Sequence, residues 1–568
     1  MARAPTPPID TATLLAHFRA LPDFDRLRSA DPAFAEAADD TLEAIFDEAA
    51  AFAADRLDPL SLDGERNPPR WENGKVVTSA LHGEIWRDYA QAGWLTLDLP
   101  ENVGGQGLPL AVAVAVQEIF DRHSAAFGMM AVSGRSAARL IRAWAAPDVA
   151  AEWVPNLLSG EWAATICISE TGAGSDAMRM TTTGRQDADG NWLITGEKHW
   201  ISFGSHDLTS RIGHCLLART QGQKGLSLFL VPDRLEDGSS NGVMIRSIED
   251  KLGLHLSPTC AMGFEDAQAN LLGEEGRGLA QMFTMITNMR ISTGAMGLGI
   301  ASGPADIALA YAQERRQGGR GPQPVPIADH ADVQRQLLDM HGRLELTRGL
   351  IYHACVIADL ARVKDDAQLA ALTQFLLPIV KTLGGEVAFG TADAAIQILG
   401  GAGYTADWPV EQALRDARVL SVFEGTTGIQ ALDMLHRRLW KDEAAGLDAM
   451  LVDADRLLVA EQDIDAAAAA RAVFAATKDC ADTLRRQTDT PVEAEAGATA
   501  FLDLAMHAAL VWTALRLLAA TGGDPHTQRL QALARFYLDT APSTARLHAD
   551  RALTGAARLS AFNTLLPA

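Results

Sequence analysis

The residues PIVKTLGGEVAFGTADAAIQILGGAGY, 378–404, and TADWPVEQALRDARVLSVFEGTTGIQALDMLHRR, 405–438, form the stretch that decides how this chain is organised. Its focus is Glu424, an acid that stands beside Phe423 in a Gly/Thr turn between two helical patterns. No Lys or Arg lies within five residues of Glu424 in the sequence. A carboxylate in an apolar, poorly solvated place has a raised pKa, which suits a general base near neutral pH. The alternative is a glutamate that satisfies a helix N-terminus, and the rest of the chain distinguishes the two.

Length and composition set the class of protein. The chain has 568 residues, 48% of them hydrophobic and 21% charged, so several globular domains are expected. The net charge is −23, and such an acidic surface repels nucleic-acid backbones and anionic membranes. We find no signal-peptide pattern at the N-terminus and no apolar run of membrane-spanning length. We therefore expect a cytoplasmic protein with no nucleic-acid partner and no membrane insertion.

Cysteine and histidine spacing argues against metal or disulfide chemistry. The five cysteines are scattered without any C-x-x-C pair, which argues against a disulfide framework and against a structural zinc site. Four histidines, at positions 199, 206, 214 and 255, invite a metal interpretation, but their spacing fits no ligand pattern. We interpret them as satisfied structural histidines and expect no metal.

The periodicity of apolar residues divides the chain into four ranges. Residues 1–162 are predicted to be helical, 163–277 to form a β domain, 278–441 a helical bundle, and 442–568 an additional helical domain. The predicted N-terminal helices are Thr41–Arg56, Ser79–Ala92, Leu110–Arg122, Ser136–Ala145 and Ala150–Leu158. The last range is mildly acidic and carries no catalytic motif, so its default role is packing or shaping of an oligomer. The fold class is thus mostly α with a central β-barrel or sandwich.

The β domain is predicted from short alternating or apolar runs. These runs are Ala163–Ser169, Thr181–Gln186, Trp192–Trp200, Ile212–Arg219, Leu226–Val231, Val243–Ser247 and Ala261–Glu265. Two loops at strand ends could carry chemistry. Ile166–Asp176 offers hydroxyls and exposed backbone N–H groups to a flat polar ring or a phosphate, and Lys198–Gly204 offers a Trp that could stack on a ring. The alternative for each is an ordinary strand end.

The second helical block contains further candidates. Four methionines in Gly278–Glu314 stand at helical spacing, and this stripe is more typical of packing than of a cofactor site. Arg290 and Arg315 are cations suited to phosphate contacts. The run Gln397–Tyr404 ends a helix with glycines, whose bare backbone could approach a ligand.

Taken together, these motifs resemble the acyl-CoA dehydrogenase family over roughly residues 40–440. The motifs that carry the resemblance are, in order, ICISETGAGSD, KHWISFG, the Arg290 helix running into ERRQGG, QILGGAGY and VFEGTTGIQ. Each is modestly specific alone, and the five in order are very specific. The extra tail and the runs FGSHDLTSRIGHCLLAR, GLSLFLVP and KLGLHLSPTC look closest to the 3-methylmercaptopropionyl-CoA dehydrogenase subgroup.

The resemblance implies FAD as cofactor and gives the residues roles. Glu424 matches the base that removes the α-proton of an acyl-CoA while hydride leaves the β-carbon for the flavin. Its backbone N–H and a flavin ribityl hydroxyl would stabilise the enolate-like transition state. The positions that match FAD contacts are Ile166, Ile168, Ser169, Gly174, Ser175, Trp200, Ser202, Arg290, Arg315, Gln317, Gln397, Ile398, Gly400, Gly401 and Thr426. Ser175, Phe423 and Gly425 match substrate contacts.

The resemblance also implies partners and leaves alternatives. An acyl-CoA would be the substrate, an electron-transfer flavoprotein the electron acceptor, and a homodimer or homotetramer the assembly. The subgroup implies 3-(methylthio)propanoyl-CoA; a short- or medium-chain fatty acyl-CoA is the alternative. A nitroalkane-oxidase-like enzyme and a flavin-binding DNA-damage-response protein are rivals, which Glu424 and the acidic tail respectively disfavour. Three positions depart from the family pattern: Phe423 replaces the usual Tyr, Thr287 the usual Asp, and ERRQGG lacks the usual aromatic ending.

Overall fold

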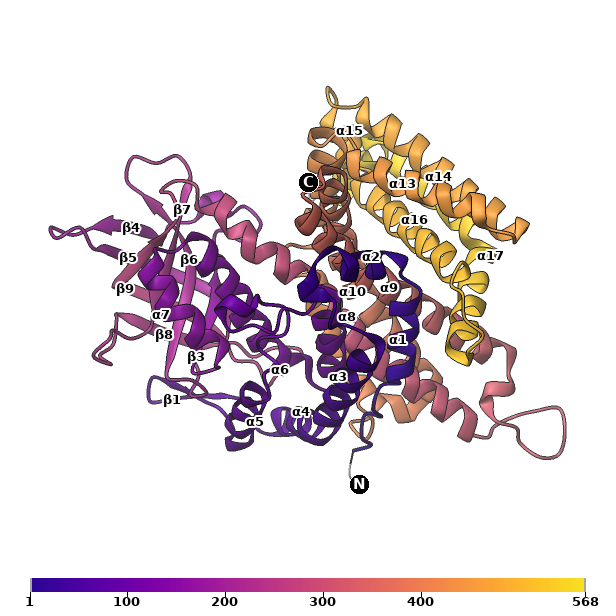
Figure 1. The fold of residues 1–568 in the computed structure, drawn as a ribbon, viewed down its shortest axis with the longest axis horizontal. Coiled ribbons are helices and arrows are strands. Elements are labelled where there is room, and N and C mark those ends of the chain that lie inside the picture. The colour runs from indigo at the N-terminus through magenta and orange to yellow at the C-terminus, as the bar shows by residue number, and fades with distance from the viewer. Residues whose placement is uncertain (1–2, 566–568) are drawn as a thin grey trace. The chain divides into compact units, whose positions relative to one another are not determined.

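The chain forms two compact units, and the computed structural model describes residues 3–565 (Figure 1). One unit comprises the residues up to Ala50, Pro109–Arg122 and the residues from Thr293 onward. The other comprises Ala51–Leu108 and His123–Ser292. The fold is mostly helical with a central β domain, which confirms the predicted fold class. The division into four ranges stays a prediction.

The β domain lies in the second unit and consists of seven strands. They are β3 (Trp162–Cys167), β4 (Thr183–Gln186), β5 (Trp192–Ser202), β6 (Arg211–Thr220), β7 (Leu226–Pro232), β8 (Val243–Ile248) and β9 (Thr259–Leu272). Each overlaps one of the seven runs predicted from alternation. Strands β6, β4, β5, β9 and β7 pair in that order, and β7 pairs again with β6, so the sheet closes on itself as a barrel. Closure leaves few unpaired strand edges.

The barrel core explains why these runs form strands. Every residue of β7 is buried, and its apolar side chains pack with those of β5, β6 and β9. Two glycines permit close packing: a Cβ at Gly213 would lie 2.4 Å from the Trp153 ring, and one at Gly184 would lie 3.0 Å from Phe229. Buried β-branched, aromatic and aliphatic side chains on a pleated surface are the main source of sheet stability.

A two-stranded hairpin in the second unit was missed in the helical prediction for residues 1–162. Strands β1 (Arg70–Glu72) and β2 (Lys75–Val77) pair antiparallel around Asn73 and Gly74. Both turn residues have positive φ, 52° and 79°. An Asn-Gly pair is the strongest short-range hairpin signal, since a two-residue turn of this hand needs positive φ at both positions. The signal was present in the sequence.

The helices of the second unit precede and follow the barrel. They are α4 (Asp58–Arg66), α5 (Ala80–Gln91), part of α6 (Leu110–Trp144), α7 (Pro147–Leu158) and the start of α8 (Gly278–Glu314). The two helices predicted at Leu110–Arg122 and Ser136–Ala145 are joined in α6, which is broken only by non-helical dihedrals at Ser124. The methionines at the start of α8 pack into a core with α7, as expected for packing residues.

The first unit contains no named strand in its described part, and its regular structure is helical. It includes the first part of α6 and the rest of α8. Its other helices are α1 (Thr11–Arg19), α2 (Pro22–Ala30), α3 (Asp39–Phe52), α9 (Ala331–Lys364), α10 (Ala367–Leu399), α11 (Val410–Ala417), α12 (Thr427–Leu432), α13 (Ala445–Ala460), α14 (Ile464–Arg485), α15 (Pro491–Glu495), α16 (Ala498–Leu518) and α17 (Pro525–Leu553). Helices α9 and α10 pack against each other, and α16 lies beside α17 and α9. The tail is therefore packed onto the bundle rather than tethered to it.

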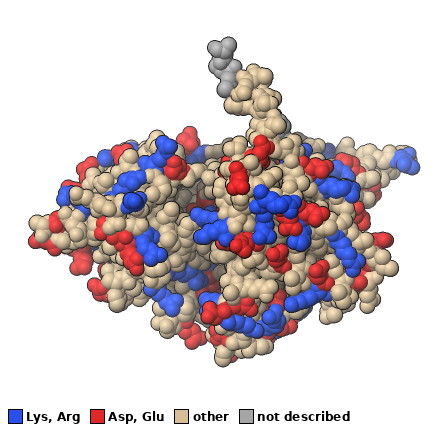
Figure 2. Space-filling model, turned by 90° about the horizontal axis from the view of Figure 1, so that it is seen from above, with Lys and Arg blue, Asp and Glu red and all other residues tan. Residues whose placement is uncertain are grey.

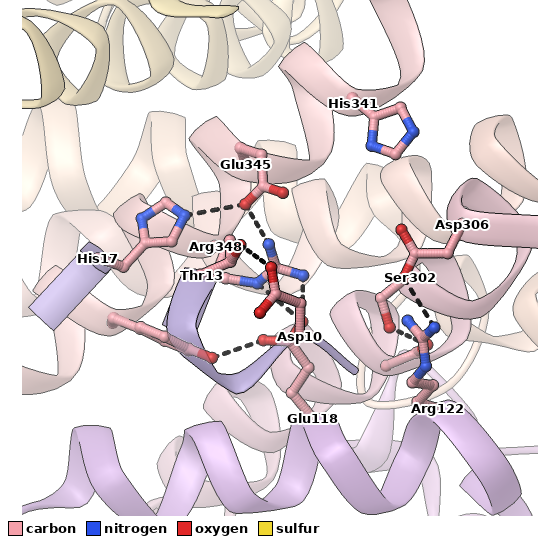
Figure 3. A network of polar contacts seen from close by, with 12 residues as sticks. Asp10, Thr13, His17, Glu118, Arg122, Ser302, Asp306, His341, Glu345 and Arg348 are labelled. Carbon is pink, nitrogen blue, oxygen red and sulfur yellow. Dashed lines mark hydrogen bonds and ion pairs between the residues drawn. The ribbon is translucent and has the colours of Figure 1, made fainter. Parts of the chain in front are cut away.

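A buried polar network joins α1, α6 and α9 (Figure 3), and Arg529 of α17 links the tail to it. Arg348 donates to Glu118 at 2.7 and 2.9 Å and also pairs with Glu345. Glu345 accepts from His17 at 2.9 Å and, at 3.4 Å, from Arg529 of α17. The acidic and basic side chains of Glu118, Glu345 and Arg348 are at most 3% exposed. Breaking such a buried pair leaves an uncompensated charge.

Among residues 3–565, two helices are long and apolar enough to cross a membrane by length and composition alone. They span Ala367–Tyr404 and Ala498–Leu518, and 83% and 89% of their most apolar windows are buried inside the protein. The prediction that no apolar run reaches this length was therefore too strict, although core helices of soluble proteins have the same property.

On the face seen in Figure 2, acidic and basic side chains are interspersed.

Candidate active site

Glu424 lies in a turn of unusual backbone geometry in the first unit. The turn connects a short 3-10 helix, Arg418–Ser421, to α12. Glu424 and Gly425 both have positive φ, 53° and 89°. A non-glycine residue in this left-handed region costs free energy, and such strain concentrates at functional sites. Thr426 caps α12, because its hydroxyl accepts from the backbone N–H of Ile429 at 3.3 Å.

Two buried side chains that the sequence analysis missed hold this turn. Lys381, on α10, donates to the carbonyl of Gly425 at 2.7 Å. Gln430, on α12, donates to the carbonyls of Glu424 and Gly425 at 3.1 and 3.2 Å. Both residues have 0% exposure. A sequence signal exists for Lys381, since it is a lone charge inside the apolar run Phe375–Leu383, but its partner 44 residues away was not predictable.

Other predicted site residues of the first unit lie around the end of α10 and after the end of α8. Helix α10 ends at Leu399, and Gly400 follows with φ 63°. Nothing lies within 4 Å of a Cβ built at Gly400 or Gly401, so their backbone is open to a ligand, while Gln397 is exposed and Ile398 buried. Arg315 and Gln317 are exposed.

The loop that holds Arg315 and Gln317 is an antiparallel ribbon after α8. The backbone N–H of Gln317 donates to Val325 at 2.9 Å, and the N–H of Ile327 donates to Arg315 at 2.7 Å. His330 contacts the Gln317 carbonyl at 2.8 Å. The ribbon fixes the backbone and leaves the two predicted side chains at the surface.

Arg290 is placed differently from the other predicted phosphate-binding residues. It lies on α8 within the second unit and is only 7% exposed. Arg315 and Gln317, further along the same helix and its loop, belong to the first unit. Their assignment to FAD stays a prediction for all three.

In the second unit, the barrel brings two predicted loops together. Strand β3 ends at Cys167, and the loop after it carries Ile168 and Ser169. The backbone N–H of His199 donates to the Ser169 carbonyl at 2.9 Å. Lys198 donates to the Ile168 carbonyl at 3.0 Å. Ile168 and Ser169 are therefore fixed beside Lys198 and His199.

A buried ion pair, not recognised in the sequence, supports this junction. Lys198 and Glu170 meet at 3.0 Å with side-chain exposures of 0% and 7%. The Glu170 carboxylate also accepts from the Thr181 N–H at 2.6 Å and the Thr182 N–H at 3.1 Å. Burial alone would raise the pKa of Glu170, but the hydrogen bonds from Thr182 and Thr181 and the Lys198 ammonium outweigh it, and the pKa falls to about 2. Burial lowers the pKa of Lys198, against the attraction of Glu170.

Trp200 is turned out of the barrel. The pairing of β5 with β9 is irregular between Lys198 and Ile201, and Trp200 and Phe203 have φ of 61° and 52°. The Trp200 side chain is 55% exposed, Ser202 is half-buried and Phe203 is buried. Bulges of this kind re-aim side chains next to active sites. An exposed indole on a strained backbone is suited to stack on a ring.

These features fit a flavin. Gly172 and Gly174 have no atom within 4 Å of an added Cβ, and Gly174 and Ser175 are exposed, so the loop after β3 presents bare backbone. Ile166, on β3, and Ile168, in the loop, are half-buried and pack against the hydrophobic core that includes residues of α7. Bare backbone N–H groups and an exposed indole are the kinds of surface that suit a flat ring with polar edges.

The histidines form no metal centre in the described part of the chain, where no group of three or more metal-ligating side chains occurs. Burial lowers the pKa of His206 and His214 to about 3, so both are neutral at pH 7. His214 contacts the Thr165 hydroxyl at 2.8 Å. The Nε2 atoms of His206 and His214 have no hydrogen-bond partner among residues 3–565, so these two are structural but only partly satisfied.

Comparison with known proteins identifies the family. Family profiles match three consecutive segments: the acyl-CoA dehydrogenase N-terminal domain at residues 39–161, the middle domain at 165–267 and the C-terminal domain at 276–439. The chain belongs to the acyl-CoA dehydrogenase family. It is therefore a flavin oxidoreductase that acts on CH–CH bonds, with FAD as cofactor and an acyl-CoA as substrate, as predicted.

Relatives of this acyl-CoA dehydrogenase extend the match into the tail. The chain is 34% identical over 545 residues to 3-methylmercaptopropionyl-CoA dehydrogenase of Ruegeria pomeroyi, covering 91% of this chain and 92% of the relative. It is 33% identical over 437 residues to a broad-specificity linear acyl-CoA dehydrogenase of Mycobacterium tuberculosis, covering 72% and 71%. In fold it is similar to an acyl-CoA dehydrogenase from Bacillus anthracis complexed with FAD, with a TM-score of 0.75, 23% identity and coverage of 92% and 90%.

Proposed function

We propose that this enzyme dehydrogenates the α,β bond of an acyl-CoA thioester, with Glu424 as the catalytic base. Glu424 takes the α-proton, the hydride leaves the β-carbon, and a carbon–carbon double bond forms between them. When bound, FAD supplies the hydride acceptor. The observation that carries the assignment is the strained Glu424–Gly425 turn, which two buried side chains hold in place.

Different residues are proposed to do different parts of the work. The backbone N–H of Glu424 is proposed to donate to the thioester oxygen, where negative charge develops as the α-proton leaves. The loop from Ile166 to Ser175, with Trp200 and Ser202, is proposed to bind the flavin ring. Arg290, Arg315, Gln317, the residues Gln397–Gly401 and Thr426 are proposed to bind the rest of FAD.

The proposed substrate is 3-(methylthio)propanoyl-CoA. Support comes from the similarity to the Ruegeria pomeroyi enzyme, which extends through the additional helical domain. Phe423, half-buried beside the base, offers an aromatic face where the family usually has a phenol. A thioether sulfur makes favourable contacts with aromatic rings, worth about 0.3–1.5 kcal/mol. A linear fatty acyl-CoA is the alternative, supported by the Mycobacterium tuberculosis relative.

Partners and setting remain proposals as well. We propose an electron-transfer flavoprotein as the electron acceptor, a homodimer or homotetramer as the assembly, and the cytoplasm as the compartment. The acidic composition is compatible with each.

Anaerobic flavin reduction tests the base. Glu424→Gln is expected to keep its flavin and to slow bleaching by acyl-CoA by about 10²–10⁴-fold, the usual contribution of a general base. Glu411→Gln is a matched control, because Glu411 pairs with Arg415 at 2.9 Å on α11. Bleaching of the Glu424→Gln variant at the wild-type rate would refute the assignment.

A panel of substrates tests the acyl group. Pentanoyl-CoA differs from 3-(methylthio)propanoyl-CoA by a methylene in place of sulfur, so the pair isolates the sulfur contact. We expect a higher kcat/KM for the thioether. Because such contacts are worth about 1 kcal/mol, the expected preference is about three- to tenfold. A preference for pentanoyl-CoA or longer chains would favour the alternative.

A further inference from the structure

Two side chains on different helices donate hydrogen bonds to the backbone carbonyls of the Glu424 turn. Lys381, on α10, and Gln430, on α12, both donate to the Gly425 carbonyl, and Gln430 also donates to the Glu424 carbonyl. The two side chains are fully buried. Each side chain reaches out of its own helix to this turn.

Keeping these donors carries a cost in stability. An ammonium group loses its hydration when it is buried, and only good hydrogen bonds offset that loss. The Gln430 amide oxygen has no hydrogen-bond partner among the described residues, so its nitrogen serves the turn while its oxygen is left unsatisfied. Such costs persist in natural proteins mainly at functional sites.

The geometry of the turn depends on the same contacts. A Cβ at Gly425 would lie 2.8 Å from the Gln430 amide nitrogen, so the donor sits directly against the backbone it supports. With φ of 53° at Glu424, the turn is a conformation that an isolated chain rarely adopts. Without the two donors, the peptides on either side of Gly425 would be free to rotate and the Glu424 carboxylate would move with them.

We propose that Lys381 and Gln430 are positioning residues that hold the Glu424–Gly425 turn and thereby aim the Glu424 carboxylate at the substrate α-proton. The proposal rests on the proposed function of Glu424. Neither donor touches the substrate in this account. Their effect is on the placement of the base, and a misplacement of about 1 Å can slow a reaction by about 10²-fold.

The experiment measures proton removal alone. Acetyl-CoA has α-protons but no β-carbon, so it cannot be dehydrogenated, and incorporation of deuterium from D₂O, followed by mass spectrometry, reports on the base. The variants are Lys381→Met, Lys381→Gln and Gln430→Leu in the flavin-loaded enzyme. Thr382→Val is the matched control, because Thr382 is the next residue of α10, is buried, and has a hydroxyl without a partner among the described residues.

We expect Lys381→Met and Gln430→Leu to slow deuterium exchange by about 10- to 100-fold, the loss typical of a hydrogen bond to a charged or strained group. Lys381→Gln keeps a donor and is expected to recover part of the rate. With an oxidisable acyl-CoA, kcat should fall while KM stays near the wild-type value. Thr382→Val should exchange like the wild type.

The outcomes separate this proposal from the assignment of the base. If Glu424→Gln exchanges as fast as the wild type, Glu424 is not the base and both ideas fail. If Glu424→Gln is inactive but Lys381→Met and Gln430→Leu exchange at the wild-type rate, only the positioning role is overturned. Should Lys381→Met fail to fold, Lys381→Gln, which keeps a polar group at the site, and Gln430→Leu decide the question in the same way.

Discussion

Replacing Glu170 by Gln should destabilise the enzyme at neutral pH by about 3 kcal/mol. The carboxylate lies against the Lys198 ammonium and two backbone N–H groups, and its pKa falls from 4.5 to about 2. Each pKa unit corresponds to about 1.4 kcal/mol, so the charged form is favoured over a neutral one by about 3 kcal/mol. Gln is a neutral isostere and should lose about that amount.

The pH dependence of this loss has a definite sign. Because the pKa of Glu170 is depressed in the folded state, its contribution is fully present above the ordinary pKa and is lost as the pH falls towards about 2. The difference between wild type and Glu170→Gln should therefore be constant from pH 6 to 8 and shrink by about 1 kcal/mol at pH 4. Urea unfolding at several pH values, monitored by circular dichroism, measures the difference.

The companion variants make the test specific. Lys198→Met leaves the Glu170 carboxylate with its hydrogen bonds from Thr181 and Thr182. It should therefore lower the free energy of unfolding by less than Glu170→Gln, which leaves the Lys198 ammonium buried without a carboxylate. The double variant Glu170→Gln/Lys198→Met removes both charges and should be more stable than Glu170→Gln alone, because an unpaired buried charge is worse than none. A Glu170→Gln enzyme that unfolds at the wild-type urea concentration, or a double variant that shows simple additivity, would refute the reasoning.

Two further outcomes are expected from other parts of the chain. Arg348→Met should lower the free energy of unfolding by about 3–5 kcal/mol, since it leaves Glu118 and Glu345 buried without their arginine. Arg335→Met is the control, because its partners Asp332 and Asp339 are exposed. It should change the free energy of unfolding by less than about 1 kcal/mol. Trp200→Ala should weaken FAD binding, which flavin release on dilution measures. It should not lower the urea midpoint of unfolding, because Trp200 is 55% exposed. An unchanged flavin affinity would contradict the proposed stacking.

Much of the barrel could be predicted from the sequence because its signal is local. Alternation of apolar residues sets which face of a strand is buried, and a run such as Leu226–Val231 carries that information by itself. The hairpin at Asn73-Gly74 was equally local and was missed only because the surrounding pattern is helical. The break at Ser124 has no such local signal, since neither Gly nor Pro marks it.

The candidate site was harder to predict because its contacts are long-range. Glu424 could be found from its motif, but the carbonyl of the next residue, Gly425, accepts from Lys381, which is 44 residues earlier in the chain. Glu170 and Lys198 stand in two separate motifs, and only the pairing of their strands and loops brings them together. A sequence pattern identifies which residue types are present; it does not tell which carbonyl a lysine reaches.

Lys198 and Lys381, both with 0% exposure, fix a loop backbone in the same way, each within its own unit. Lys198 donates a hydrogen bond to the Ile168 carbonyl in the second unit, and Lys381 donates one to the Gly425 carbonyl in the first. Each ammonium is expensive to bury, and a methionine of similar length would fill the same volume without that cost. What a methionine cannot do is hold a backbone carbonyl in a loop that has no regular hydrogen-bond partner of its own. Both loops carry residues proposed to take part in the reaction. The stability lost by burying each lysine is therefore best explained by the need to hold the backbone of these loops in place.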